Sequence, residues 1–466
     1  MKSFWSPTII QGGMGMYVSG WRLAREVSMT GQLGTLSGVC LEKALVWILQ
    51  QGDPGGHVRR ALSHFPFQSH AEMILDKFYV EGGVKDERKI RFPPVFTINP
   101  SPTLISLTVC ANFSFVWLAK EGHNGYVSIN YLEKIAMPHV FSITGAMMAD
   151  VDFITMGAGI PLQVPSVIDA VTEGRTAEYR IPVEGTSITS HMMSFNPVEF
   201  FEGNLPQMKK PGFIPIIASN LLARVFVEKL PESQRVFGFV VEEPTAGGHN
   251  APPRRPPNYG DKDKVNYQKI KETGIPFWIG GSYASPEGLK RALDLGAAGI
   301  QAGSIFALSD ESEIRDDLKE ILRREGFNYT LRVNTDMNSS PTDFPFKVAQ
   351  IPGTVSDSSV HEERPRICNM CALVTLCERP GGGEIGYRCP AEPIEKYITK
   401  GGKVEDTKGR ICLCNGLLAT VGMNVVYEPA LVTMGDDTSF LRHLMEDEED
   451  SYGAKRAVKY LLGQLG

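Results

Sequence analysis

One pattern constrains the fold of this 466-residue chain most strongly: short β-branched segments alternate with helical segments over residues 7–308. Several short segments are nearly all apolar, as strands covered on both faces are. Eight strands with helices between them predict an α/β fold, a (β/α)8 TIM barrel, with a doubly wound parallel sheet as the alternative. The expected strands are Thr8–Gln11, Gln32–Ser37, Tyr126–Asn130, Asp152–Met156, Phe213–Ser219, Gly238–Glu243, Pro276–Gly281 and Gly299–Gly303. The expected helices are Trp21–Thr30, Pro138–Ala149, Val164–Glu173, Leu221–Leu230 and Ser285–Leu295.

Two stretches do not fit a bare barrel. Residues 41–121 lie between the second and third strands, and we expect an inserted helical subdomain there, with an extra strand at Pro94–Ile98. Residues 309–466 follow the last strand as a C-terminal extension, which contains a Cys-rich segment at 366–416. The domain prediction is therefore a barrel over residues 1–308 and an extension over the remainder.

Charge and hydropathy exclude several classes of protein. The formal net charge is −6, whereas a general nucleic-acid binder needs a basic field. The longest apolar stretch, Leu104–Ala119, is interrupted by Asn112, so we expect a buried helix and no membrane span. No apolar export signal is recognisable at the N-terminus, and we therefore expect a cytoplasmic protein with reduced cysteines.

Glycine clusters follow several of the expected strands. Gly12, Gly13 and Gly15 follow the first strand, where bare backbone N–H groups can approach a flat or anionic ligand. Gly280-Gly281 and Gly303-Ser304 end the seventh and eighth strands, where barrels most often bind phosphate. Each cluster alone is also compatible with a tight turn, but the last two together predict a phosphate site.

A histidine lies in a fourth glycine-rich loop, after the strand Gly238–Glu243. His249 follows Gly247 and Gly248 at the end of the strand at which barrels place catalytic groups. Its ordinary pKa of about 6.5 suits a general base near neutral pH. The alternative is a histidine that hydrogen-bonds within its own loop for structural reasons.

These motifs, in this order, resemble the nitronate monooxygenase (2-nitropropane dioxygenase) family of FMN-dependent TIM barrels. The sequence segments that carry the resemblance are Ile9–Gly15, Gly31–Gly34, Ala246–His249, Ile279–Gly281 and Gly296–Ser304. Flavin-dependent enoyl-acyl carrier protein reductases are related and share similar glycine clusters. The resemblance implies an FMN-dependent oxidoreductase, first a nitronate monooxygenase that oxidises alkyl nitronates with dioxygen. The alternative is an enoyl thioester reductase associated with a fatty acid or polyketide synthase.

The resemblance also implies roles for individual residues. His249 matches the catalytic histidine of the family. FMN would be bound by Gly13, Met14, Gly15, Asn130, Gly248, Gly280, Gly281, Gln301, Gly303 and Ser304. Asn99 is a rival to Asn130 as the flavin-contacting asparagine. The implied partners are a small nitronate or an acyl thioester and, in the reductase case, an acyl carrier protein. Homo-oligomerisation stays open.

Two features depart from that family pattern. Arg254 and Arg255 follow His249 in a proline-rich loop, which we interpret either as a lid for an anionic group or as a surface loop. The Cys-rich segment contains one C-x2-C pair and one C-x-C pair, spacings that suit zinc or an iron–sulfur cluster. The candidate metal ligands are Cys368, Cys371, Cys389 and Cys412. The alternative is a set of reduced thiols that packs a small subdomain.

Overall fold

The protein folds around a closed eight-stranded parallel barrel. The computed structural model describes residues 6–186, 191–203, 205–423 and 428–465. The strand order is β1-β10-β9-β8-β7-β4-β3-β2, and all seven pairs are parallel. The barrel closes where Gln11 N donates to Leu33 O at 2.9 Å, next to the Ile10–Leu33 bridge. The predicted TIM barrel is confirmed, and the doubly wound alternative is excluded.

All eight expected strands are present, each within a few residues of its predicted bounds. They are β1 (Ile9–Gln11), β2 (Gly34–Ser37), β3 (Val127–Leu132), β4 (Phe153–Gly157), β7 (Gly212–Ile217), β8 (Phe239–Glu242), β9 (Phe277–Gly280) and β10 (Gly299–Ala302). Nearly every strand residue is buried, because the barrel interior covers one face and the helices cover the other.

Side chains from six strands fill the lower half of the barrel interior. The cluster consists of Ile10, Leu33, Phe153, Ile214, Val240 and Trp278. Trp278 is fully buried, and its indole Nε1 donates to Pro7 O at 2.7 Å. Strand residues two positions further along the chain face the same interior at the C-terminal end. That end has no equivalent filling, and the cavity described below lies there.

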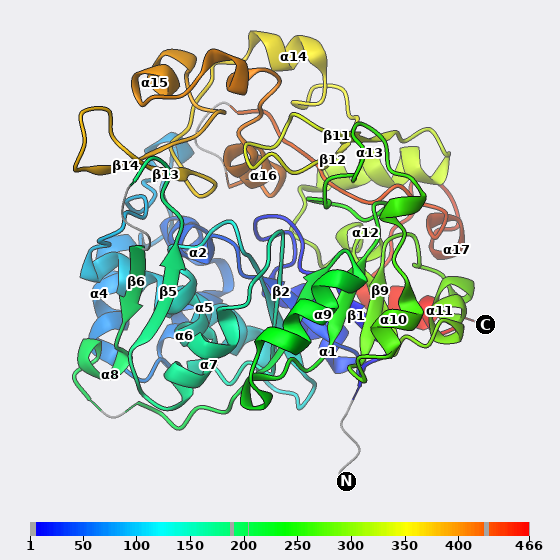
Figure 1. The fold of residues 1–466 in the computed structure, drawn as a ribbon, viewed down its shortest axis with the longest axis horizontal. Coiled ribbons are helices and arrows are strands. Elements are labelled where there is room, and N and C mark those ends of the chain that lie inside the picture. The colour runs from blue at the N-terminus through cyan, green and yellow to red at the C-terminus, as the bar shows by residue number, and fades with distance from the viewer. Residues whose placement is uncertain (1–5, 187–190, 204, 424–427, 466) are drawn as a thin grey trace.

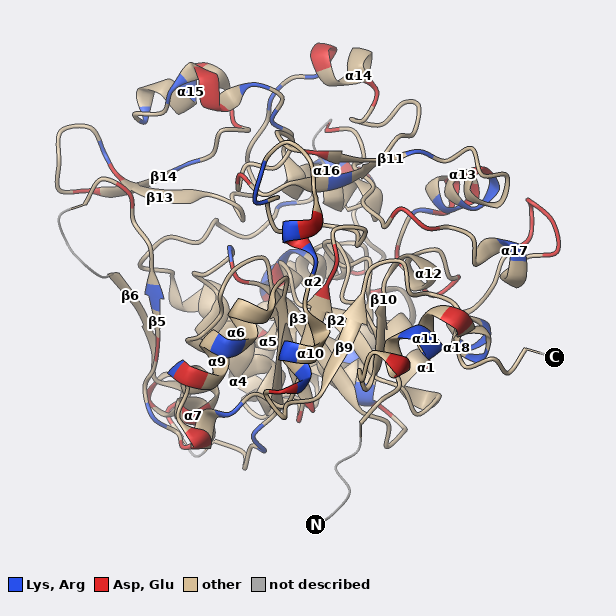
Figure 2. Cartoon of the chain, turned by 45° about the vertical axis from the view of Figure 1, so that its right-hand side comes forward, with Lys and Arg blue, Asp and Glu red and all other residues tan. Residues whose placement is uncertain are grey.

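The helices around the barrel follow the predicted pattern. They are α1 (Trp21–Met29), α6 (His139–Met148), α7 (Val164–Thr172), α9 (Asn220–Lys229), α10 (Tyr267–Lys271), α11 (Pro286–Asp294) and α12 (Ser304–Ala307). Ser219 and Ser285 cap α9 and α11 by accepting a hydrogen bond from a first-turn N–H. Figure 2 shows that many charged residues lie on the peripheral helices and loops, whereas the central strands are mostly uncharged.

The stretch between β2 and β3 is helical. It contains α2 (Leu41–Gln50), α3 (His57–Leu62), α4 (Gln68–Phe78) and α5 (Pro102–Lys120). α5 is long and apolar enough to cross a membrane, but 78% of its apolar window is buried within the fold. The predicted buried helix is therefore confirmed, whereas the predicted strand at Pro94–Ile98 is wrong. That segment is an irregular connection that begins with the pair Pro93-Pro94, and Pro lacks the N–H that a strand ladder needs.

Three antiparallel pairs and several further helices lie outside the barrel. The pairs are β5 (Ala177–Ile181) with β6 (His191–Phe195), β11 (Val333–Asp336) with β12 (Phe346–Ala349), and β13 (Thr375–Glu378) with β14 (Ile385–Arg388). The further helices are α8 (Pro197–Phe200), α13 (Asp316–Phe327), α14 (Ser358–Glu363), α15 (Ile394–Thr399), α16 (Leu413–Thr420), α17 (Leu441–Leu444) and α18 (Ala454–Leu461). In Figure 1 the part of the extension that contains α14, α15 and α16 lies above the barrel, on its C-terminal side.

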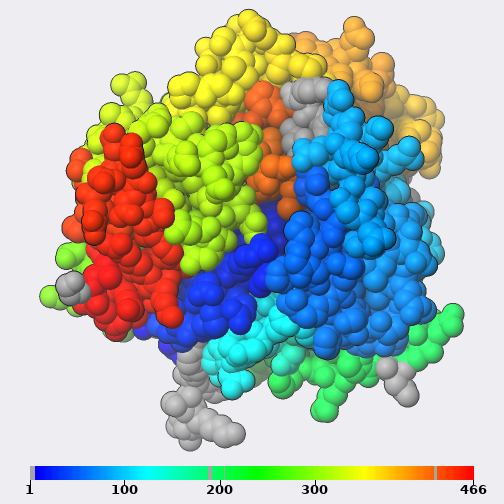
Figure 3. All heavy atoms as spheres, turned by 180° about the vertical axis from the view of Figure 1, so that it is seen from behind, coloured from blue at the N-terminus to red at the C-terminus, as the bar shows by residue number. Residues whose placement is uncertain are grey.

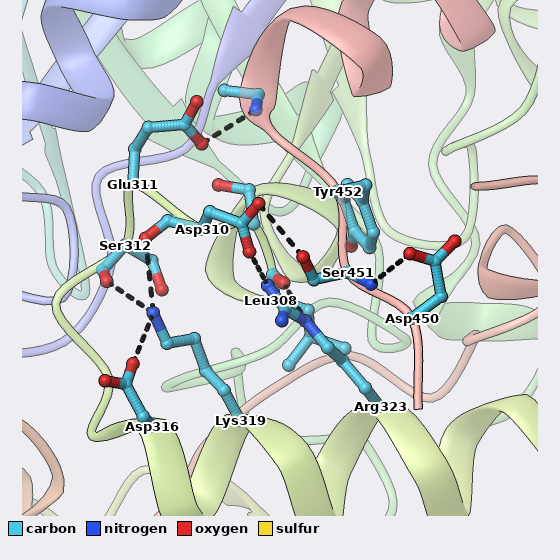
Figure 4. Close-up of polar contacts among 12 residues, drawn as sticks. Leu308, Asp310, Glu311, Ser312, Asp316, Lys319, Arg323, Asp450, Ser451 and Tyr452 are labelled. Atoms are coloured by element: carbon cyan, nitrogen blue, oxygen red, sulfur yellow. Dashed lines mark hydrogen bonds and ion pairs between the residues drawn. The ribbon is translucent and has the colours of Figure 1, made fainter. Parts of the chain in front are cut away.

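The end of the chain returns to the barrel. α18 packs against α1, α11 and α12, and Figure 3 shows this segment beside the yellow-green elements that follow β10. Figure 4 shows its polar attachment: Ser451 Oγ donates to Asp310 Oδ2 at 3.2 Å, and Ala454 N donates to Glu311 Oε2 at 2.8 Å. Arg323 links Asp310 to α13 in the same view. The extension is thus anchored to the barrel at its far end as well.

Candidate functional site

A cavity of about 220 Å³ opens at the C-terminal ends of the barrel strands. Each residue that the sequence proposed for catalysis or cofactor binding lines it. They are Gly13, Met14, Gly15, Asn130, Gly248, His249, Gly280, Gly281, Gln301, Gly303 and Ser304. The structure therefore brings together residues from five different strand ends, as a TIM-barrel active site does.

Two polar side chains fix the first glycine loop. Ser19 Oγ accepts from Met14 N at 3.0 Å and donates to Gly12 O at 3.1 Å. Gln11 Nε2 donates to the same hydroxyl at 3.0 Å, while its carbonyl accepts from Thr35 N at 2.8 Å. Both side chains are fully buried. Sequence reasoning missed both supports, although Gln11 directly precedes the loop.

Asn130 is fixed against this loop. Its Nδ2 donates to Gly13 O at 3.2 Å, and its Oδ1 accepts from Thr155 Oγ1 at 2.9 Å. A Cβ atom on Gly13 would lie 2.4 Å from the Asn130 Cβ, so only glycine fits at that position. The rival Asn99 lies outside the cavity wall, in the connection that precedes α5.

The opposite wall contains the two later glycine clusters. Gly281 has a φ of +104°, and a Cβ there would lie 2.8 Å from Thr245 Oγ1. This hydroxyl is buried and has no hydrogen-bond partner among the described residues. Ser304 Oγ accepts from Gly435 N at 2.8 Å, which orients the hydroxyl at the start of α12. The wall thus combines close backbone approach with one unsatisfied hydroxyl.

His249 borders the cavity from the loop after β8. A hydrogen bond of 2.8 Å joins its Nε2 to Ser340 Oγ, and its ring packs edge-on against Phe346 with centroids 4.8 Å apart. Burial, followed by the positive charge of Lys134, lowers the pKa of His249 to about 4. This pKa lies below the range in which an unperturbed histidine titrates, so the imidazole is neutral at physiological pH.

The C-terminal extension covers the cavity and is hydrogen-bonded to its loops. Lys347 N donates to Gly248 O at 3.0 Å, and Gly248 N donates to Thr433 Oγ1 at 2.8 Å. The buried ammonium group of Lys347 lies 2.7 Å from both carboxylate oxygens of Asp436. Asp436 N in turn donates to Thr245 O at 3.3 Å. The extension therefore forms the roof of the cavity, and the glycine-rich loop of His249 is paired with it.

The roof is mostly apolar. Its side chains in the cavity wall are Phe346, Ala372, Leu373, Cys414, Leu417, Met434 and Phe440, beside the polar Thr433 and Asp437. Sequence reasoning missed all of them, because nothing in the order of the chain shows that residues 346–440 fold back over the barrel.

Two adjacent glutamates at the end of β8 have opposite surroundings. Glu242 lines the cavity, and burial raises the pKa of its carboxyl group to about 8. Glu243 is not a wall residue, and it accepts from the Tyr267 hydroxyl at 2.5 Å and from the Tyr283 hydroxyl at 3.4 Å. Among the described residues of the cavity wall there is no Lys or Arg. A charged ligand here must therefore be bound by backbone N–H groups and neutral side chains.

A second cavity, of about 320 Å³, adjoins the first. The two share the wall residues Val39, Tyr131, Leu132, Ile135, Ala372 and Leu373. Unlike the first cavity, the second is bordered by the cationic side chains of Lys43 and Lys134. The second cavity also has acidic residues in its wall, namely Glu42, Glu184 and Asp343, so it combines side chains of both charge signs.

The cysteine prediction has a different outcome. The Cys368 thiol hydrogen-bonds with Cys371, Cys389 and Cys412, so the four proposed ligands are neighbours, and these contacts raise the pKa of Cys368. However, no group of three or more His, Cys, Asp or Glu in the described parts of the chain is arranged to hold a metal ion. All eight cysteines are free. The structure thus does not support zinc or an iron–sulfur cluster.

The proposed arginine lid is not part of the cavity. Arg254 and Arg255 are exposed, and neither belongs to the wall of either cavity. Arg254 N donates to Asp263 Oδ1 at 2.8 Å, which holds this loop against its own continuation. The interpretation as a surface loop agrees with the structure.

The fold and the site define a TIM barrel with a roofed, glycine-lined cavity at its C-terminal mouth. Neither the comparison with protein-family models nor that with curated sequences finds a match. Among solved structures, FabK from Thermotoga maritima is similar over 98% of this chain and 92% of that chain, with a TM-score of 0.50 and 14% identity. Nitroalkane oxidase from Streptomyces ansochromogenes aligns over 98% of this chain and 95% of that chain, with a TM-score of 0.46 and 12% identity. At 14% identity, the likeness to FabK establishes a shared fold.

Proposed function

We propose that this protein is an FMN-dependent oxidoreductase. The observation that carries the proposal is the convergence of all eleven sequence-derived residues, from Gly13 to Ser304, on one cavity. Residues that the family resemblance selected one by one from distant parts of the chain lie together without any further assumption. FMN, when bound, supplies the transfer of electrons or hydride, and the protein binds and orients it.

The cavity wall fits FMN. Gly13 and Gly281 leave no room for a side chain, so a planar ring and a phosphate can approach the backbone there. Thr245 Oγ1 supplies a buried hydroxyl that lacks a partner among the described residues. Asn130 and Gln301 add amide groups to the wall. In the absence of wall Lys or Arg, backbone N–H groups would bind the phosphate.

The first candidate reaction is the oxidation of alkyl nitronates with dioxygen. Its specific support is His249 in the cavity wall, which matches the catalytic histidine of the family and whose pKa of about 4 leaves a neutral imidazole beside the ligand. Ser340 and Phe346 hold the ring in place. Since its cysteines are free thiols, the proposed setting is the cytoplasm.

The second candidate is the reduction of an enoyl thioester, with an acyl carrier protein as partner. The adjoining cavity favours it, because an acyl thioester is long and the phosphate of its pantetheine arm is anionic. Lys43 and Lys134 offer cationic contacts there beside the acidic Glu42, Glu184 and Asp343, so the support lies in the additional space, which a small nitronate would not need.

Anaerobic flavin bleaching separates the two candidates. Purified protein loaded with FMN would be mixed in one experiment with propionate 3-nitronate and in another with NAD(P)H. Bleaching by the nitronate supports the first reaction, and bleaching by NAD(P)H alone supports the second. Protein that binds no FMN would contradict the whole proposal. The double variant Arg254→Ala, Arg255→Ala is a matched control, since both side chains are exposed outside the cavity wall.

A further inference from the structure

Glu242 faces the cavity because of its position in β8. Val240, two residues earlier, belongs to the side-chain cluster that fills the lower barrel. Alternate strand residues face the same side, so the Glu242 side chain lies above that cluster, at the C-terminal mouth. In the ladder Glu242 pairs with Gly280 of β9, which lines the same cavity. The carboxyl group thus lies among the residues proposed to bind FMN.

The Glu242 carboxyl group makes no hydrogen bond and no ion pair with the described residues, in contrast to its neighbour. Glu243 has two tyrosine hydroxyls as partners. A carboxylate without partners in an enclosed space is costly, so the neutral acid is favoured and the pKa rises to about 8. The protonated form is the main one at pH 7.

The titratable groups around this carboxyl group carry little positive charge. His249 is neutral, and Asp437 borders the cavity from the roof. Tyr283 lies in the wall after β9, and the pKa of Tyr259 is raised by burial and by the charges of Asp263 and Glu242. Burial is thus the cause of the raised pKa of Glu242.

We propose that Glu242, as a neutral carboxylic acid, donates a hydrogen bond to the substrate oxygen on which negative charge resides. The inference rests on the proposed function and deepens it. In nitronate oxidation the acceptor is an oxygen of the nitronate, and in thioester reduction it is the oxygen of the developing enolate. The site is built for an oxyanion without a cation, since no Lys or Arg is among its described wall residues.

The proton stays on Glu242 throughout, so no bond to it is broken. A bound oxyanion favours the neutral acid and raises the Glu242 pKa further. Conversely, ionisation of Glu242 in the free protein places two negative charges together, so affinity for an oxyanion falls as pH rises above about 8.

Three variants test the role. Glu242→Gln keeps a neutral hydrogen-bond donor that cannot ionise, Glu242→Leu removes the donor, and Glu243→Gln changes the neighbour outside the cavity wall. We expect Glu242→Leu to lower kcat/KM by about 100-fold or more, the usual effect of losing one oxyanion donor. Glu242→Gln should stay within tenfold of wild type and lose the decline above pH 8. Activity of Glu242→Leu within threefold of wild type, or of Glu242→Gln as low as that of Glu242→Leu, would overturn the proposal.

A readout without catalysis separates this inference from the proposed function. The infrared carbonyl band of a protonated carboxylic acid should be present at pH 7, vanish in Glu242→Gln, and persist in Glu243→Gln. Propionate, an oxyanion that neither reaction consumes, should shift the band and bind at least tenfold more weakly to Glu242→Leu. Absence of the band, or equal propionate affinity, refutes the role even in active protein. If wild type turns over neither substrate, the proposed function fails, while band and propionate binding still decide the role of Glu242.

Discussion

Replacing Glu242 by Gln should stabilise the protein, although it removes an ionisable carboxyl group from the site. The pKa of the carboxyl group rises from 4.5 to about 8 on folding, so the folded chain holds a proton that the unfolded chain releases between these values. Stability is therefore lost as pH rises from 4.5 through 8. The interval from pH 4.5 to pH 7 is about 2.5 units, so the unfolding free energy falls by about 3.4 kcal/mol over it, at 1.36 kcal/mol per unit. Water in the cavity solvates the carboxyl group and reduces this to about 1–3 kcal/mol.

The assay is urea unfolding of wild type and Glu242→Gln at several pH values, with FMN in the same excess. The difference in unfolding free energy should be near zero at pH 4.5, grow with pH, and level off above pH 8. Glu243→Gln is the matched control and should not reproduce this pH dependence, because Glu243 is not a wall residue and its carboxylate has two tyrosine hydroxyls as partners. Parallel pH profiles for wild type and Glu242→Gln would refute the reasoning from burial.

The other predictions concern the loops around the cavity. Gly13→Ala should weaken FMN binding about tenfold or more, because the new Cβ would lie 2.4 Å from a β3 side chain. The measurement is the flavin content after dialysis. The control Gly260→Ala should leave FMN binding unchanged, because a Cβ there meets open space. Asp436→Asn should cost about 1–3 kcal/mol of unfolding free energy, because the buried Lys347 loses its charge partner; an unchanged urea midpoint contradicts this. On the acid side of its pH profile, nitronate turnover should decline only towards pH 4, since His249 stays neutral above that pH. An inflection at pH 6.5 would contradict the structure.

The sequence determined the barrel and the part of the site that belongs to it. Strands covered on both faces are continuous apolar runs, so the eight barrel strands could be located from the local sequence. The glycine clusters followed because barrel loops begin where these runs end. The strand expected at Pro94–Ile98 failed because an apolar composition does not supply a pairing partner. The β5 segment Ala177–Ile181 alternates buried and exposed residues, a pattern that indicates a strand with one covered face.

Only the tertiary structure decided what closes the cavity and how its groups ionise. The roof from Phe346 to Phe440 contacts the barrel through pairings such as Lys347 N with Gly248 O, and such long-range contacts leave no periodic trace in the sequence. Glu242 and Glu243 are adjacent residues of the same type. Glu242 nevertheless borders the cavity, whereas Glu243 accepts hydrogen bonds from two tyrosine hydroxyls. Burial and partners set a pKa, and both depend on which surfaces the folded chain brings together.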